Sequence, residues 1–82
     1  MQLTVRYFAG ASAAARVDEE QVELPDGATV DALAALLGDR HGAALARVLA
    51  SSTFLVDEVP GSRDRTLVGA RQVDVLPPFA GG

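Results

Sequence analysis

Hydrophobic and polar positions alternate along the first eight residues of the chain. Leu3, Val5 and Tyr7 fall on one face, and the residues between them fall on the other. A period of two with β-branched and aromatic side chains predicts a strand. Residues 21–24 alternate in the same way before a Pro-Asp-Gly turn, which predicts a second strand. Together they predict an antiparallel hairpin whose long connection is a loop or a short alanine-based helix.

A helical period replaces the alternation from Thr29 onward. Apolar side chains recur at positions i, i+3, i+4 and i+7 from Val30, which predicts a helix over residues 29–42 with one apolar face. Thr29 is a favourable N-cap, because its side-chain oxygen can accept a hydrogen bond from a backbone N–H of the first turn. Residues 43–51 repeat the pattern more briefly, which predicts a second, shorter helical piece.

Two further strands are predicted in the second half of the chain. Residues 53–59 form one, Pro60 and Gly61 provide a turn after it, and residues 71–76 form the last strand. Leu67 lies in a brief element between them that we expect to tuck under the sheet. Strands that flank a main helix predict an α+β fold, a mixed sheet with the helix packed on one face. The first and last strands are expected to lie side by side as a parallel pair.

The composition narrows the class of protein. A chain of 82 residues is expected to form one domain. The chain contains no cysteine, which excludes disulfides, thiolate metal sites and cysteine nucleophiles. Its net charge of −4, with the arginines spread along the chain, argues against a nucleic-acid partner. No apolar run approaches the ~20 residues that a membrane helix needs, and no signal peptide is visible, so the expected location is the cytoplasm.

Candidate catalytic side chains are scarce. His41 is the only histidine, and it follows Arg40 near the end of the predicted helix, where a cation is favoured. No cysteine or second histidine is present to complete a metal site. The hydroxyls of Ser12, Ser51 and Ser52 have no recognisable histidine–acid set beside them. We therefore do not expect an enzyme that acts on its own.

The last six residues differ in character from the rest of the chain. Pro77 and Pro78 lack N–H groups, so they end the sheet ladder and favour an extended exit. The two terminal glycines carry no side chains, so this end can enter a narrow active site where any Cβ would clash. A frayed terminus without a function is the alternative interpretation. The predicted organisation is a domain of residues 1–76 and an extended tail of residues 77–82.

Three stretches of the sequence resemble a known family. Residues 5–11 (VRYFAGA), 24–37 (LPDGATVDALAALL) and 73–82 (VDVLPPFAGG) resemble the opening strand, the strand–turn–helix segment and the ending of ubiquitin-like sulfur carriers with the β-grasp fold. Within that group the chain is most similar to the small subunits of molybdopterin synthase. Three places depart from the family pattern. The Arg-Glu pair often seen shortly after the first strand is not evident in residues 10–17 (GASAAARV). Asp57 stands where asparagine is usual, and residues 69–73 lack the usual Gly-Asp-x-Val.

The resemblance implies that the chain acts through its C-terminal carboxylate. In this family an E1-like partner enzyme adenylates the terminal glycine, here Gly82, and the adenylate is replaced by sulfur to give a thiocarboxylate. The charged carrier then docks on the large subunit of the synthase, in a heterotetramer, and donates its sulfur to a cyclic pyranopterin. This implies a role in molybdenum cofactor biosynthesis. The chain itself is implied to bind no cofactor and no metal, since ATP is used by the partner enzyme.

The side chains are expected to supply docking contacts. Phe8 and Leu76 fall out of phase with the apolar faces of their strands, so each is either an interface residue on the outer face or a part of the core. We expect the two to lie close to Val59. The implied partner-binding set is Phe8, Val59, Leu76, Pro77, Pro78, Phe79 and Ala80, next to the reactive Gly81 and Gly82.

Other functions of such a chain stay open at this point. It resembles carriers of cysteine biosynthesis in its ending, whereas thiamine carriers are usually shorter and lack the two prolines. A ubiquitin-like modifier, joined through its glycine to a lysine of a target, and an interaction module with an inert ending are further alternatives. The absence of lysine fits a chain whose C-terminus becomes activated, because no side-chain amine is present to capture it. Biased codon usage would produce the same composition.

Overall fold

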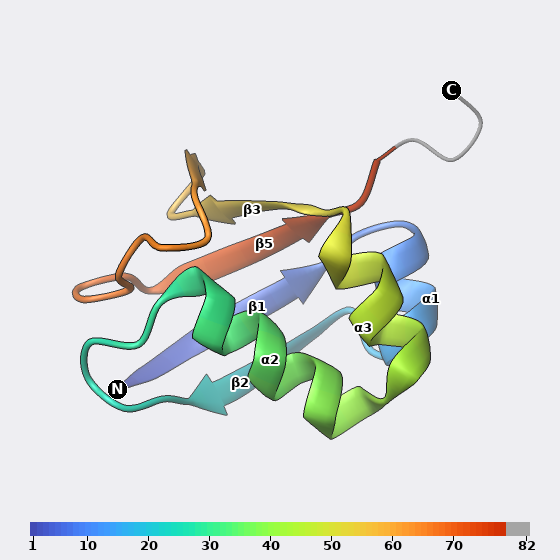
Figure 1. The fold of residues 1–82 in the computed structure, drawn as a ribbon, viewed down its shortest axis with the longest axis horizontal. Coiled ribbons are helices and arrows are strands. Elements are labelled where there is room, and N and C mark those ends of the chain that lie inside the picture. The colour runs from blue at the N-terminus through green and yellow to red at the C-terminus, as the bar shows by residue number, and fades with distance from the viewer. Residues whose placement is uncertain (79–82) are drawn as a thin grey trace.

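The computed structural model describes residues 1–78 and shows a five-stranded mixed sheet with helices on one face (Figure 1). The order across the sheet is β2-β1-β5-β3-β4. This arrangement confirms the predicted α+β class. The strands are β1 (Gln2–Tyr7), β2 (Glu19–Glu23), β3 (Thr53–Val56), β4 (Val59–Gly61) and β5 (Gln72–Leu76), and the helices are α1 (Gly10–Ala15), α2 (Val30–His41) and α3 (Ala43–Ala50).

The first and last strands lie together in the middle of the sheet. β1 and β5 are parallel, with Val5 opposite Val73 and Tyr7 opposite Val75. β2 pairs antiparallel with the other edge of β1, so the predicted hairpin and the predicted parallel pair are both confirmed. Figure 1 shows β1 and β5 pointing the same way, toward the end of the molecule where α1 and α3 lie. The C-terminal ends of the two strands therefore meet at one place.

The connection between β1 and β2 contains the short helix α1. Ala11 and Ala15 are buried, so the small alanine side chains let this helix approach the rest of the core closely. The helix ends at Arg16, which has a left-handed backbone and donates its N–H to the carbonyl of Ser12. Of the two predicted forms of this connection, the alanine-based helix is the one that forms.

The main helix begins and packs as its sequence pattern predicts. The N–H of Ala32 donates to the side-chain oxygen of Thr29 at 3.1 Å, so Thr29 is the N-cap. The four side chains of the i, i+3, i+4, i+7 pattern are all buried against the sheet: Val30, Leu33, Ala34 and Leu37. The second helix packs tightly on the first. An added Cβ on Gly38 of α2 would lie only 3.2 Å from the Cβ of Ala46 in α3.

The predicted turn at Pro60 and Gly61 is wrong. The chain turns earlier, at Asp57 and Glu58, whose φ angles are 47° and 71°, and Pro60 and Gly61 belong to the return strand β4. Two consecutive residues with positive φ make the tight hairpin turn that matches strand twist, although glycine or asparagine usually occupies such positions. Pro60 is tolerated in β4 because this strand forms the edge of the sheet, where one missing donor breaks no ladder.

Asp57 also explains why this turn forms without glycine. Its carboxylate accepts hydrogen bonds from the backbone N–H groups of Arg71 and Gln72, at 3.1 and 3.0 Å. The N–H of Asp57 in turn donates to the carbonyl of Gln72 at 2.9 Å. Two of the departures from the family pattern, at Asp57 and over residues 69–73, are thus parts of one contact that ties the turn to the start of β5.

The core lies between the inner face of the sheet and helices α2 and α3. Phe54 is its largest fully buried side chain, and Leu67 is fully buried as expected. Leu67 is held there because its N–H donates to the carbonyl of Ala28 at 2.9 Å. The remaining fully buried large side chains are aliphatic: Leu3, Leu33, Leu37, Leu45, Val5, Val22, Val30, Val56, Val73 and Val75. None of the helices in the described part of the chain has the length and hydropathy that a membrane crossing requires.

A carboxylate joins three elements at the edge of this core. Oε2 of Glu20 in β2 accepts a hydrogen bond from the hydroxyl of Tyr7 at 2.5 Å, and Nε2 of His41 lies 2.5 Å from the same oxygen. Oε1 of Glu20 accepts a hydrogen bond from Arg40 at 2.9 Å. Burial alone would raise the pKa of Glu20, but the hydrogen bonds from Tyr7, His41 and Arg40 outweigh it and hold the pKa below its usual value. Burial, together with the bond to Glu20, raises the pKa of Tyr7.

This contact predicts a pH dependence of stability. Because the pKa of Glu20 is lower in the folded chain than in the unfolded chain, its contribution is complete above the ordinary glutamate pKa and is lost as the pH falls through the folded value. Substitution Glu20→Gln should lower the free energy of unfolding at pH 7 by about 1.5–3 kcal/mol, the usual size for hydrogen bonds to a charged group. Urea unfolding between pH 7 and pH 3 measures this.

The matched control is Glu23→Gln on the same strand, because the side chain of Glu23 is exposed and makes no hydrogen bond within residues 1–78. It should leave the stability at pH 7 nearly unchanged. Equal pH dependence of Glu20→Gln and the unchanged chain would show that the carboxylate does not hold these elements together.

Candidate functional site

The base of the C-terminal tail lies on an apolar groove. β5 ends at Leu76, and Pro77 and Pro78 then continue along the rim of a cavity of about 490 Å³. We call this cavity the tail-base groove. None of the residues that line it carries a charge: Phe8, Ala9, Gly10, Val48, Ser51, Leu76, Pro77 and Pro78. The groove thus brings together the end of β1, the end of α3 and the start of the tail.

Phe8 and Leu76 are brought together, as the sequence predicts. The N–H of Phe8 donates to the carbonyl of Val75 at 3.2 Å, which extends the β1–β5 pairing to the last residue before the turn. Phe8 is 37% exposed, and Leu76 is partly buried, whereas their strand neighbours Tyr7 and Val75 are in the core. The interpretation of Phe8 and Leu76 as core residues is therefore wrong. Both lie at the surface beside the tail.

Val59 lies elsewhere. It opposes Val56 in the β3–β4 hairpin, and Val56 opposes Val73 near the start of β5, whereas Leu76 at the end of β5 opposes Thr53. Val59 is 55% exposed at the edge strand. The expected closeness to Phe8 and Leu76 fails because the chain has already turned at Asp57 and Glu58. A docking role for Val59 stays a prediction.

Two outward-facing residues were not anticipated. Leu55 opposes Asp74 on one side and Pro60 on the other, so all three share the face of the sheet that the helices leave uncovered. Leu55 is out of phase with the buried Phe54 and Val56, and this alternation was the available signal. Pro60 could not be placed without the position of the turn.

An ion pair lies on the same outer face. Arg6 donates through Nε and Nη2 to the two carboxylate oxygens of Asp74, at 3.0 and 3.1 Å, and Gln72 donates to one of them at 3.1 Å. Asp74 is only 5% exposed, so these bonds replace the water that the carboxylate loses. The hydrogen bond and the charge of Asp74 raise the pKa of Arg6. The guanidinium lies 5.4 Å from the centre of the Phe8 ring, and this cation–π contact links the ion pair to a residue that lines the groove.

The turn after Phe8 has a strained backbone. Ala9 has φ 51° and ψ −125°, and the N–H of Ala11 donates to the carbonyl of Phe8 at 3.0 Å. These values define a type II′ turn with Ala9 at the position that glycine usually occupies. A non-glycine residue held in such a conformation costs about 1–3 kcal/mol. The strain is located at a wall of the tail-base groove.

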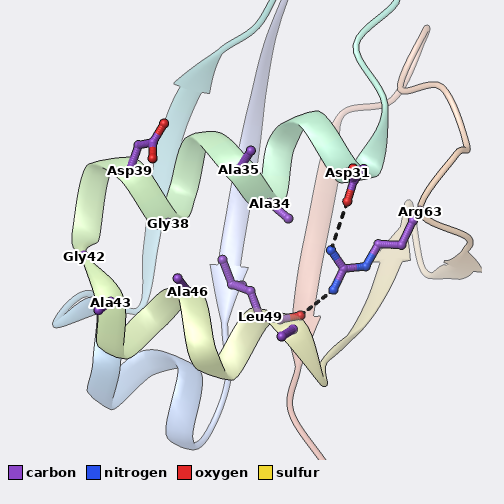
Figure 2. Close-up of a pocket in the computed structure, with 11 residues that line it drawn as sticks. Asp31, Ala34, Ala35, Gly38, Asp39, Gly42, Ala43, Ala46, Leu49 and Arg63 are labelled. Carbon is purple, nitrogen blue, oxygen red and sulfur yellow. Dashed lines mark hydrogen bonds and ion pairs between the residues drawn. The ribbon is translucent and has the colours of Figure 1, made fainter.

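A second cavity, of about 610 Å³, lies between α2 and α3 (Figure 2). Figure 2 shows Arg63 reaching across its end, where it donates to the carboxylate of Asp31 at 3.4 Å and to the carbonyl of Leu49 at 2.6 Å. The remaining lining is mostly alanine and glycine, which follows from the close packing of the two helices. Within residues 1–78 no cluster of side chains is suited to hold a metal ion. This cavity therefore marks the place where α2 and α3 pack against each other.

Comparisons with known proteins agree with this arrangement. The family model described as the ThiS family matches residues 5–82. A candidate molybdopterin converting factor, subunit 1, from Pyrococcus furiosus is 28% identical, with a TM-score of 0.79, and the match covers 96% of this chain and 99% of that one. A search of curated proteins found no match.

Two structures from Haloferax volcanii show the fold. Small archaeal modifier protein 1 has a TM-score of 0.85 at 20% identity, and the match covers 100% of this chain and 100% of that one. The protein HVO 2177 has a TM-score of 0.82 at 24% identity over 100% of this chain and 87% of that one. The β-grasp fold is thereby confirmed. The predicted roles of Phe79, Ala80, Gly81 and Gly82 lie outside the described residues.

The turn at Ala9 predicts a stabilising substitution. Ala9→Gly removes the strain of the positive φ but adds freedom to the unfolded chain, so the net gain should be about 1 kcal/mol. Thermal unfolding should show a midpoint higher by about 4–8 °C for a domain of this size. Ala13→Gly, an exposed position inside α1, is the control and should lower the midpoint. A lower midpoint for Ala9→Gly as well would mean that the backbone at this position is relaxed.

Proposed function

Because this chain belongs to the ThiS family of ubiquitin-like sulfur carriers, we propose that its carried group is a thiocarboxylate on Gly82. The pathway that we assign to it is molybdenum cofactor biosynthesis, in which it serves as the small subunit of molybdopterin synthase. The observation that carries the proposal is the exit of the tail. Pro77 and Pro78 leave the central strand β5 beside the exposed ring of Phe8, on an uncharged groove.

The chemistry that this proposal requires uses the terminal carboxylate. An oxygen of the Gly82 carboxylate attacks the α-phosphorus of ATP in the partner enzyme, and pyrophosphate leaves as the new acyl phosphate bond forms. A hydrosulfide-equivalent donor then attacks the carbonyl carbon, and AMP leaves with the electrons of the C–O bond. The product is a thiocarboxylate, a sulfur nucleophile in a chain without cysteine. When its sulfur is transferred to a pyranopterin and water cleaves the acyl bond, the carboxylate is restored.

The fold supports this chemistry by presenting the end of the chain. A terminal carboxylate can enter a deep active site only if the residues just before it have small side chains and the folded domain stays outside that active site. The prolines at 77 and 78 restrict φ to about −65°, so they give the tail a defined direction. The apolar surface beside them then suits a partner that must dock closely. A partner adenylating enzyme and a synthase large subunit, with the heterotetramer that the latter implies, follow from this assignment.

Two features support the molybdopterin pathway over the other carriers. The similarity at 28% identity to the candidate molybdopterin converting factor of Pyrococcus furiosus extends over nearly the whole of both chains. The sequence ending Leu-Pro-Pro before the last four residues also matches the pattern of that carrier group. Retention of the synthase large subunit on the immobilised chain separates this pathway from cysteine or thiamine biosynthesis.

The proposal predicts a mass change at Gly82. The chain purified under denaturing conditions from its own host should include a fraction that is heavier by the difference between one sulfur and one oxygen atom, and fragmentation should place this change on Gly82. Intact-mass spectrometry measures it. A population with only free carboxylates, or one joined to lysines of other proteins, contradicts the carrier assignment.

Extension of the chain provides the matched variant. One serine added after Gly82 should abolish ATP–pyrophosphate exchange by the host's adenylating enzyme, because the attacking carboxylate is displaced from the reacting position. Val68→Ser, an exposed substitution in the loop before β5, should leave this exchange unchanged. Full exchange with the extended chain would show that Gly82 is not the reacting residue.

A further inference from the structure

The sheet has two edges, and they differ in what they offer to another chain. β4 is three residues long and contains Pro60, so it presents few free backbone groups. β2 is five residues long, contains no proline and has no strand beyond it (Figure 1). We propose that β2 receives an extended segment of a partner protein, bearing lysine or arginine, as a sixth strand. This site is independent of the function proposed above and leaves the tail free, because β1 separates β2 from β5.

The register of the β1–β2 pair determines which backbone groups of β2 point outward. The N–H of Leu24 donates to the carbonyl of Met1 at 2.8 Å, which makes these two residues a hydrogen-bonded pair. Bonded and non-bonded pairs alternate in an antiparallel ladder, so residues 20, 22 and 24 direct their backbone groups toward β1. The N–H and C=O groups of residues 19, 21 and 23 therefore point away from the sheet.

These outward groups have little contact with the described part of the chain. None of the three N–H groups donates to an acceptor within residues 1–78. Arg40 of α2 lies 3.5 Å from the carbonyl of Gln21, but its shorter bond, at 2.9 Å, goes to the carboxylate of Glu20. An added strand can therefore bond to β2 without breaking any bond of the existing ladder.

The side chains along this edge are acidic. Five of the eleven acidic residues of the chain lie within residues 18–26, and no basic residue lies among them. Glu19 and Glu23 are exposed and form no ion pair within residues 1–78. Opposite charges across two strands stabilise their pairing, and like charges directly opposite destabilise it. A strand with lysine or arginine at alternate positions therefore complements these two carboxylates.

Two basic side chains beside β2 are already engaged by other carboxylates. Arg6 opposes Glu19 in β1, but its Nε and Nη2 donate to Asp74 at 3.0 and 3.1 Å. Arg40 forms its ion pair with Glu20. A cation of an added strand thus does not have to displace an existing ion pair to reach Glu19 or Glu23.

A second copy of this chain is the rival occupant. In an antiparallel β2–β2 pair that overlaps all three outward residues, Gln21 faces Gln21 of the other copy, and Glu19 faces Glu23 in both halves. Two pairs of like charges then lie directly opposite each other. Charged side chains are a common means of keeping an edge strand from pairing with its own copies. The charge that suits a basic strand therefore disfavours self-association through the same edge.

The test uses the full, isotope-labelled chain and a cyclic β-hairpin peptide with lysine at three alternate positions of its open edge. Cyclisation fixes the strand before binding, so little entropy is lost in the complex. We expect the amide signals of Glu19, Gln21 and Glu23 to shift and their N–H groups to become protected from hydrogen exchange. The same hairpin with glutamate in place of lysine should bind about tenfold more weakly or less. The absence of binding by the lysine hairpin overturns the proposal.

Gln21→Pro separates strand addition from simple attraction of charge. Proline removes the outward N–H of residue 21 and leaves the ladder to β1 intact, since that N–H does not belong to it. The affinity for the lysine hairpin should fall about tenfold or more. Gln21→Ala loses the same side chain but keeps the N–H, and it should bind as the unchanged chain does. Full binding by folded Gln21→Pro would show only adsorption of a cation to an acidic surface, which overturns the proposal.

A double variant tests the chemistry of the occupant and does not rely on proline. Glu19→Gln with Glu23→Gln should weaken binding of the lysine hairpin about three- to tenfold while the thermal unfolding midpoint stays within a few degrees. Glu58→Gln with Asp64→Asn changes the net charge equally at two exposed positions around β4 and should leave the affinity unchanged. An equal loss in both double variants would mean that net charge alone is recognised. A dimer of the unchanged chain that Gln21→Pro dissociates in sedimentation would assign the edge to a second copy. Either result overturns the proposal.

Discussion

The parallel pairing of β1 with β5 is the constraint on which the rest of this structure depends. It joins the first and last strands in the centre of the sheet and points both toward the same end. Phe8, just after one strand, and Pro77, just after the other, are therefore neighbours although they are far apart in the sequence. A parallel pair needs a long crossover, which α2, α3 and the β3–β4 hairpin provide. The crossover also supplies the core that holds the pair in place.

The same pairing also determines which residues lie on each of the two faces of the sheet. Residues in one phase of β1 and β5 are buried under the helices, and residues in the other phase form the outer face. Asp74 shows the cost of that outer position in a central strand, because its carboxylate is nearly buried and needs Arg6 and Gln72 as partners. That bonding in turn fixes the guanidinium near the Phe8 ring. A structural ion pair and the edge of the candidate site are thus one assembly.

Much of this could be predicted from local patterns, and the exceptions share a physical cause. Alternation identified the strands and showed that Phe8 and Leu76 are out of phase with the apolar faces of their strands, although it left a core position open for both. The 3.6-residue period identified the buried face of α2. The turn at Asp57 and Glu58 could not be found, because its positive φ angles occur without glycine and depend on bonds to the backbone at residues 71 and 72. The positive φ of Ala9 could not be predicted from the sequence for the same reason. Where long-range contacts enforce an unfavourable backbone, residue preferences give no signal.

The location of the rigidity bears on how a carrier of this kind can work. The strained turn at Ala9 and the prolines at 77 and 78 all lie where the tail leaves the domain. A domain of this size has little stability to spare, so strain at Ala9 is tolerated only if the neighbouring contacts hold it. The consequence is that the first two residues of the tail, Pro77 and Pro78, have a defined position and direction. For the carrier function proposed here, an enzyme that seats the carboxylate of Gly82 would start from a fixed point four residues away, so the entropy that it must overcome is correspondingly small.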